Sequence, residues 1–175
     1  MTVEVIGSIV VGLMAGSFAL LAFGGDSLIE LVSGITVLQF LRKVRSDEDK
    51  RTEQMTVALL FALIPVIGLG AVYSYATGLR AEGSPLGIAI AIGAVIIMPW
   101  LWYEKKRIGK ETRTVPLEID AVESITCLFM SIALLAGLLG VYLFGLWWLD
   151  YSATAVILVF VAKEATEAYH ELHEK

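Results

Sequence analysis

Long apolar runs separated by short polar breaks organise the whole chain. The breaks lie at residues 42–54, 79–84 and 103–116, where charged and turn-forming residues gather. They leave three apolar blocks and a long final one. A helix needs about 17 to 25 apolar residues to cross a bilayer, and each block is long enough to do so. The pattern therefore predicts a set of transmembrane helices.

The first and last blocks are too long for one helix each. The first covers residues 3–41, and the last covers residues 117–168. The last block breaks within residues 145–151, where Trp147 and Asp150 suit a membrane interface. Six helices result, and we expect an all-α integral membrane protein built as a six-transmembrane-helix bundle.

The residues alone leave two ways to divide the first block. Hydropathy favours a first helix over residues 5–23 and a second helix that starts at Ser27, because two glycines precede a capping box formed by Ser27 and Glu30. Asp26 and Glu30 would then be solvated at the interface. In the other division both carboxylates lie inside the membrane, where they would mark an ion pathway.

Composition narrows the possible classes of protein. Of the 175 residues 57% are hydrophobic, which excludes a water-soluble fold, and no segment of domain size is left for a soluble domain. Apolar runs of helical length favour a helix bundle over a β-barrel. The net charge of −5, without a basic domain, gives no reason to expect nucleic-acid binding. The first 23 residues lack a basic leader, so we expect them to stay in the fold.

Clusters of basic residues predict the orientation in the membrane. Lys and Arg accumulate in short cytoplasmic loops, and the break between the two clusters holds only Arg80. Both termini of a six-helix chain would then be cytoplasmic, and we expect a multi-pass protein of the plasma membrane. The clusters consist of Arg42, Lys43, Arg45, Lys50 and Arg51, and of Lys105, Lys106, Arg107, Lys110 and Arg113.

Acidic residues within the apolar runs are the candidate functional residues. A charged side chain inside a span costs about 2.5–3.5 kcal/mol on insertion scales, so it normally faces a cavity and marks an ion or proton pathway. Residues four apart share a helix face, so a pair at this spacing presents two potential ligands to one neighbour. The candidate metal ligands are Asp26 with Glu30 and Glu123 with Cys127, with Glu4 and Asp120 as further candidates.

The second pair has the clearer case on position alone. Pro116 can open a helix, which puts Glu123 about 10 Å from the start of that helix, too deep to be solvated. Asp120 is closer to the helix N-terminus, which favours an interfacial acid. Cys127 is the single cysteine and cannot form an internal disulfide, so it is either a small packing residue or a soft metal ligand.

Several segments together resemble the transmembrane domain of the cation diffusion facilitator family, especially its short members that lack the cytosolic domain. Residues 16–30, which read GSFALLAFGGDSLIE, resemble the family's second helix, where a Gly-Ser turn precedes an acid-x-x-x-acid ligand pair. Residues 120–127, DAVESITC, resemble its fifth helix. Residues 84–89 with 98–99 resemble the fourth helix, and residues 147–150 and 163–168 resemble the sixth.

The resemblance implies a single transmembrane domain over residues 1–175 that turns at Gly16 and Ser17. The second helix then carries Asp26 and Glu30 into the membrane, and Glu4 lies at a depth close to that of Glu30. The expected helices cover residues 2–15, 18–42, 54–78, 85–103, 116–143 and 147–170.

The resemblance also implies a tetrahedral metal site between the second and fifth helices. Family members commonly carry His or Asp, and then Asp, at the positions of Glu123 and Cys127, so this chain departs from the family pattern. The departure bears on the identity of the metal. A thiolate favours zinc or another soft ion, whereas carboxylates suit manganese or iron(II).

The function implied by the resemblance is efflux of a divalent metal cation, such as zinc, manganese or iron(II), in exchange for protons. The cation is a transported substrate, no permanent cofactor is expected, and the family suggests a homodimer. A membrane metal sensor or a partner-assembly module without transport turnover is the alternative function. We do not expect an enzyme, because the sequence shows no His-rich constellation, no phosphate-binding glycine loop and no nucleophile with a base.

Overall fold

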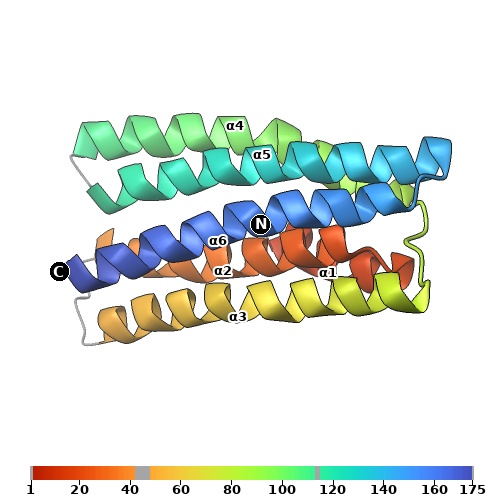
Figure 1. Ribbon diagram of the computed structural model, residues 1–175. Coiled ribbons are helices and arrows are strands. Elements are labelled where there is room, and N and C mark those ends of the chain that lie inside the picture. The colour runs from red at the N-terminus through yellow and green to blue at the C-terminus, as the bar shows by residue number, and fades with distance from the viewer. Residues whose placement is uncertain (1, 42–47, 113–114, 175) are drawn as a thin grey trace.

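The computed structural model is built from α-helices that run side by side along one axis (Figure 1). It describes the backbone of residues 2–41, 48–112 and 115–174, and the side chains of residues 2–32, 34, 54–111, 121 and 123–170. The six helices in the described residues are α1 (Thr2–Ala15), α2 (Phe18–Leu41), α3 (Glu48–Thr77), α4 (Pro85–Thr112), α5 (Val115–Phe144) and α6 (Trp148–Glu174).

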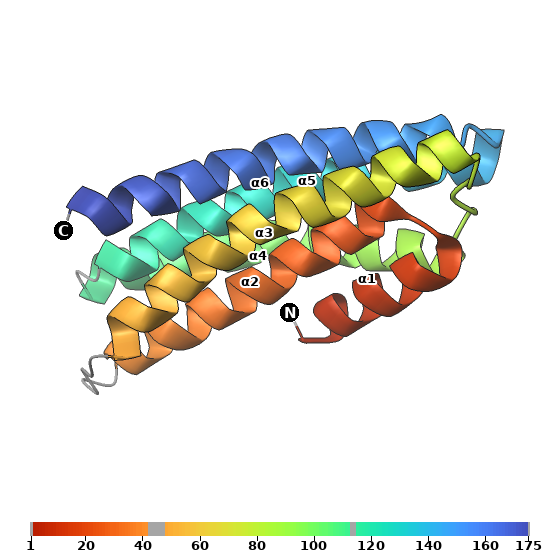
Figure 2. The same cartoon turned by 60° about the horizontal axis from the view of Figure 1, so that its bottom comes forward.

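Helix α2 occupies a central position in the bundle. It packs against α1, α3, α5 and α6, while α4 packs against α5 and α1, and α3 also packs against α6 (Figures 1 and 2). Residues that α2 turns toward α5 and α6 are therefore shielded from the surroundings of the protein. The expected helix pair for a metal site, α2 and α5, is in direct contact.

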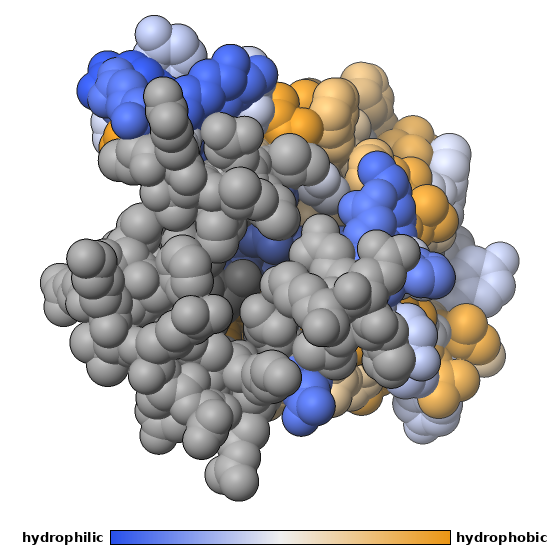
Figure 3. Space-filling model, turned by 90° about the vertical axis from the view of Figure 1, so that its left-hand side faces the viewer, coloured by the Kyte–Doolittle hydropathy of each residue, from blue (hydrophilic) through white to orange (hydrophobic). Residues whose placement is uncertain are grey.

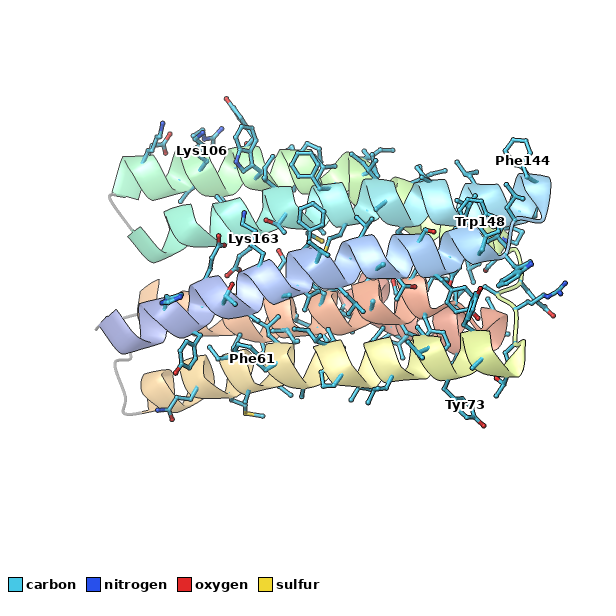
Figure 4. All side chains as sticks on the ribbon, in the orientation of Figure 1. Phe61, Tyr73, Lys106, Phe144, Trp148 and Lys163 are labelled. Carbon is cyan, nitrogen blue, oxygen red and sulfur yellow. The ribbon has the colours of Figure 1, made fainter. Side chains whose placement is uncertain are left out.

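The two ends of the bundle differ in chemistry. At one end α1 turns into α2, α3 into α4 and α5 into α6 (Figure 1). We call it the aromatic end, because the rings of Tyr75, Trp147 and Tyr151 meet there, with centroids 5.7 to 6.0 Å apart. We call the opposite end the basic end, because the last turns of α4 there carry exposed Lys106 and Lys110. Lys106 lies toward the basic end and Trp148 at the aromatic end in Figure 4.

The turn between α1 and α2 falls at Gly16 and Ser17. Gly16 has a φ of 62°, which a glycine adopts without steric cost. The Oγ of Ser17 accepts a hydrogen bond from the amide of Leu20 at 3.1 Å, so Ser17 caps the start of α2. A helix start at Ser27, which hydropathy favours, is wrong, because Ser27 lies in the middle of α2.

Helix α1 is shorter than the others. It has 14 residues, which corresponds to a length of about 21 Å. Its first described residue, Thr2, lies about midway along the bundle, whereas α6 ends at the basic end (Figures 1 and 2). The start of α1 therefore brings Glu4 to the middle of the bundle rather than to one of its ends.

Three helices extend beyond the apolar segments that predict them. Helix α3 begins at Glu48, α4 continues to Thr112 and α6 continues to Glu174. In the polar part of α4, Arg107 pairs with Glu104 at 3.2 Å and with Glu111 at 3.6 Å, one turn away on either side. Such pairs support a helix in water. Hydropathy marks the stretch in contact with lipid, and the backbone stays helical past it.

The outer surface of the bundle is apolar. Among the residues that the structure describes, three helical segments are long and apolar enough to cross a membrane: Gln54–Thr77, Pro85–Glu111 and Glu123–Phe144. Large side chains such as Leu69 and Val159 are about 70% exposed, and Tyr73 points away from α3 (Figure 4). An apolar surface of this extent fits a lipid environment. The all-helical chain is therefore a membrane protein.

Small residues allow the helices to approach closely. A Cβ added to Gly137 of α5 would lie 2.7 Å from the Cβ of Ala153 in α6, and one added to Gly24 of α2 would lie 2.9 Å from the Cβ of Ser8 in α1. Gly93 of α4, in contrast, borders open space. Glycine at a helix interface lets two backbones come together without a side chain between them.

Candidate metal centre

Helix α2 carries two acids into the interior of the bundle. Asp26 is 3% exposed and Glu30 is 7% exposed, and their spacing of one helical turn places both on one face. Ionised carboxylates at such positions are costly unless other groups compensate them. Neither residue is the solvated interfacial acid that the capping-box interpretation allowed.

Helix α5 brings the second pair of candidate residues. Glu123 is half-buried, Ser124 is fully buried and Cys127 is 1% exposed. The spacing of four residues places Glu123 and Cys127 on one face of α5. The backbone of Asp120 belongs to the same helix, but its side chain lies outside the described residues.

Carboxyl groups from three helices interact electrostatically in the interior of the bundle. The carboxyl group of Asp26 is close enough to those of Glu30, Glu123 and Glu4 for electrostatic interaction. Glu4 also interacts with Glu30, so the start of α1 contributes to the same group of charges. The structure thus brings together four of the acids that the sequence singled out, from α1, α2 and α5.

A fifth acid, Glu164 of α6, was not among the candidates from the sequence. It is half-buried and lies within electrostatic range of Asp26 and Glu30. A periodic signal could have found it, because buried Ile157, Val161 and Ala165 mark the inner face of α6 at helical spacing, and Glu164 is next to that face.

The ammonium group of a lysine side chain also lies among these acids. Lys105 of α4 has its Nζ 3.6 Å from Oε1 of Glu30 and donates a hydrogen bond of 2.8 Å to Oγ of Ser124. Its side chain is only 17% exposed. The basic cluster that predicted a cytoplasmic loop therefore contains one lysine that points into the bundle.

The donor atoms suit a divalent cation but are not assembled around one. Carboxylate oxygens and a thiol are the groups that bind zinc, manganese or iron(II). In the part of the chain that the structure describes, no three His, Cys, Asp or Glu side chains are close enough together to hold a metal ion. The hydroxyls of Ser8 and Ser27 are also buried and make no hydrogen bond within that part.

Figure 3 views the basic end and shows hydrophilic residues there, next to hydrophobic residues on the sides of the bundle. At the aromatic end, hydrogen bonds join the connections between helices. The amide of Glu82 donates to the carbonyl of Ala15 at 2.9 Å, and the hydroxyl of Tyr151 donates to the carbonyl of Leu79 at 2.7 Å.

A comparison with protein families identifies the family to which the chain belongs. The model of the family described as the cation efflux transmembrane domain matches residues 2–171, a range that includes Glu4 near its start and Glu164 near its end. A comparison with curated proteins gave no match. The resemblance to the cation diffusion facilitators is thereby confirmed over nearly the whole chain. The chain belongs to the cation efflux family of transmembrane cation transporters, and it corresponds to the transmembrane domain of that family.

Proposed function

We propose that this chain transports a divalent metal cation across the membrane through a site between α2 and α5. The observation that carries the proposal is the electrostatic interaction between buried Asp26 of α2 and Glu123 of the adjacent helix α5. Buried carboxylates in a membrane protein are costly, and they normally mark an ion or proton pathway. The family to which the chain belongs is one of cation transporters.

We assign four residues as ligands of the transported ion: Asp26, Glu30, Glu123 and Cys127. Glu4 and Asp120 are additional ligands in this proposal. The nature of the donors favours zinc, manganese or iron(II), because a thiolate and several carboxylates satisfy borderline and harder divalent ions. No permanent cofactor takes part, since the metal is the substrate.

The proposed direction is efflux from the cytoplasm. In this proposal the six-helix bundle spans the plasma membrane with the basic end on the cytoplasmic side, because Lys106 and Lys110 at that end follow the positive-inside rule. In this proposal the ion enters the bundle from the basic end, and both termini of the chain face the cytoplasmic side.

Protons are the proposed counter-substrate. Metal ligands must be deprotonated to bind, so protons that arrive from the outside would release the cation. The bundle would expose the site to one side at a time, as transporters with a central site do. The proposed working unit is a homodimer, an expectation taken from the family.

A paired substitution tests this proposal. We expect Glu123→Gln to abolish metal-dependent proton movement in proteoliposomes, because it removes a charge from the site with little change in shape. Glu111→Gln is the matched control, since Glu111 has a 66% exposed side chain on the polar end of α4. The control should transport at the wild-type rate.

Two outcomes would contradict the proposal. If the Glu123→Gln protein moves metal and protons at the wild-type rate, the ligand assignment is wrong. If the wild-type protein binds metal in detergent but produces no flux in liposomes, the chain acts as a metal sensor and not as a transporter.

A further inference from the structure

Lys105 differs from its basic neighbours on α4. Lys106 is exposed and lies over the ring of Trp102 at 4.7 Å, and Lys110 is exposed as well. The Lys105 side chain is 17% exposed and points toward the inside of the bundle, where it contacts Glu30. This position differs from that of an ordinary lysine near a membrane interface, which extends its ammonium into water.

The ammonium of Lys105 connects three helices. It donates a hydrogen bond of 2.8 Å to the buried Ser124 of α5 and lies 3.6 Å from the Glu30 carboxylate of α2. Helix α4 packs on α5 and α1, whereas α2 packs on α1, α3, α5 and α6. The long side chain therefore carries a positive charge from the periphery of the bundle to a residue of its central helix.

The charge balance of the interior explains this arrangement. Asp26 is within electrostatic range of Glu30, Glu123 and Glu4, so the centre carries an excess of acidic groups. A buried charge is costly unless another charge and hydrogen bonds compensate it. The ammonium compensates Glu30, and Ser124 accepts one of its three protons.

We propose that Lys105 is a tethered counter-cation that competes with the transported metal ion for Glu30. This inference rests on the proposed function, because it takes Glu30 as a metal ligand. A metal ion that reaches the site must displace the ammonium from Glu30, and the ammonium returns when the ion leaves. The competition weakens metal binding and so favours release, which a transport site requires.

The same competition selects for charge. A monovalent cation that displaces the ammonium replaces one positive charge by another and gains little Coulomb energy. A divalent cation brings twice the charge to the same carboxylates, so its attraction exceeds that of the ammonium. Lys105 is therefore a specificity-determining residue that favours divalent over monovalent substrates.

Metal binding to the purified full chain tests the inference directly. We expect Lys105→Met to bind Zn²⁺ and Mn²⁺ at least about fivefold more tightly than the wild type in isothermal titration calorimetry, a gain at the lower end of typical coupling between sites. Lys105→Arg keeps the charge and should show no gain. Lys106→Met is the matched control, because Lys106 is exposed, and it should bind like the wild type.

A double substitution shows whether the effect acts through Glu30. In a Glu30→Gln background the Lys105→Met substitution should produce no further gain, since the carboxylate for which the two cations compete is absent. If Lys105→Met does not fold, Lys105→Gln is the substitute, because it keeps a hydrogen bond to Ser124 and lacks the charge. Thermal melting in detergent separates folding from binding.

The outcomes distinguish this inference from the proposed function. Unchanged or weaker binding by the Lys105→Met and Lys105→Gln proteins, with normal binding by the wild type, overturns the role of Lys105 and leaves the transport site intact. An equal gain in the Glu30→Gln background also overturns it. A wild-type protein that binds neither Zn²⁺ nor Mn²⁺ overturns both the inference and the proposed site.

Discussion

Ser17 and Asp150 are joined by a hydrogen bond of 2.5 Å between the Ser17 hydroxyl and Oδ1 of Asp150, across 133 residues of sequence. Oδ2 of the same carboxylate accepts a hydrogen bond of 3.0 Å from the amide of Phe18. Asp150 thus fixes the start of α2 to the start of α6 at the aromatic end. The pair therefore fixes the start of the helix that carries Asp26 and Glu30.

Removal of this carboxylate should destabilise the protein. In Asp150→Ala, the buried Ser17 hydroxyl and the Phe18 amide lose their acceptor, which costs about 1–3 kcal/mol for each buried unsatisfied group. We expect a clear fall in the melting temperature in detergent, measured by tryptophan fluorescence. Asp150→Asn keeps one oxygen acceptor and should recover part of the loss.

Ser152→Ala serves as the control, because Ser152 is exposed and bonds only to a carbonyl of its own helix within the described structure. An Asp150→Ala protein with the melting temperature of the wild type would show that the contact contributes nothing to stability.

The contact between α5 and α6 should not tolerate a methyl group at Gly137. A Cβ there would lie 2.7 Å from the Cβ of Ala153 and 3.2 Å from the carbonyl oxygen of Leu149, so the two backbones must move apart. Overpacking of this kind costs about 1–3 kcal/mol. We expect Gly137→Ala to lower the melting temperature, whereas Gly93→Ala on α4 should leave it unchanged or raise it, since Gly93 borders open space. Equal melting of both variants would contradict the packing account.

Cys127 should influence which metal the site prefers. A thiolate favours zinc, while a hydroxyl is a poor zinc ligand and suits harder ions. Loss of even an outer-shell partner of a metal site typically weakens binding about 10- to 100-fold, so Cys127→Ser should weaken Zn²⁺ binding at least about tenfold. Mn²⁺ binding should change much less. The ratio of Zn²⁺ to Mn²⁺ affinity, measured by calorimetry, is the readout.

The alternative role of Cys127 predicts a different result. If its buried sulfur only fills space, Cys127→Ala and Cys127→Ser leave the ratio of the two affinities at the wild-type value.

Glu164 should contribute charge to the centre from α6. Its electrostatic interaction with Asp26 and Glu30 implies that Glu164→Gln weakens divalent metal binding, by about fivefold or more. Glu167→Gln is the control, because Glu167 is exposed and pairs with Lys163 at 3.6 Å on the outer side of α6. Radioactive metal binding to purified protein would detect the difference. Equal affinities of the two variants would exclude Glu164 from the site.

The helices themselves could be predicted from the sequence because they depend on local patterns. Apolar runs of membrane-spanning length predict helices in lipid, and acids four residues apart share a helix face whatever the rest of the chain does. The family match over residues 2–171 agrees with this interpretation. The ends of α3, α4 and α6 were less predictable, because hydropathy reports the contact with lipid while the helices continue into water.

The division of the first block shows where local signals are ambiguous. Gly24 and Gly25 followed by Ser27 have the composition of a helix start, yet all three residues lie inside α2. Gly24 serves instead to admit α1, whose Ser8 and Ile9 occupy the space that a Cβ would fill. A glycine can break a helix or accommodate a neighbour, and only the presence of the neighbour decides between the two.

The sequence by itself determined an all-helical membrane protein with acidic residues inside its apolar runs, because periodicity and hydropathy are properties of consecutive residues. Only the tertiary structure decided that Lys105 and Glu164 join those acids. Each comes from a segment far along the chain, and the rotation of a helix about its axis depends on which helices surround it. The side chains that complete the centre are therefore set by packing between helices, which no local pattern records.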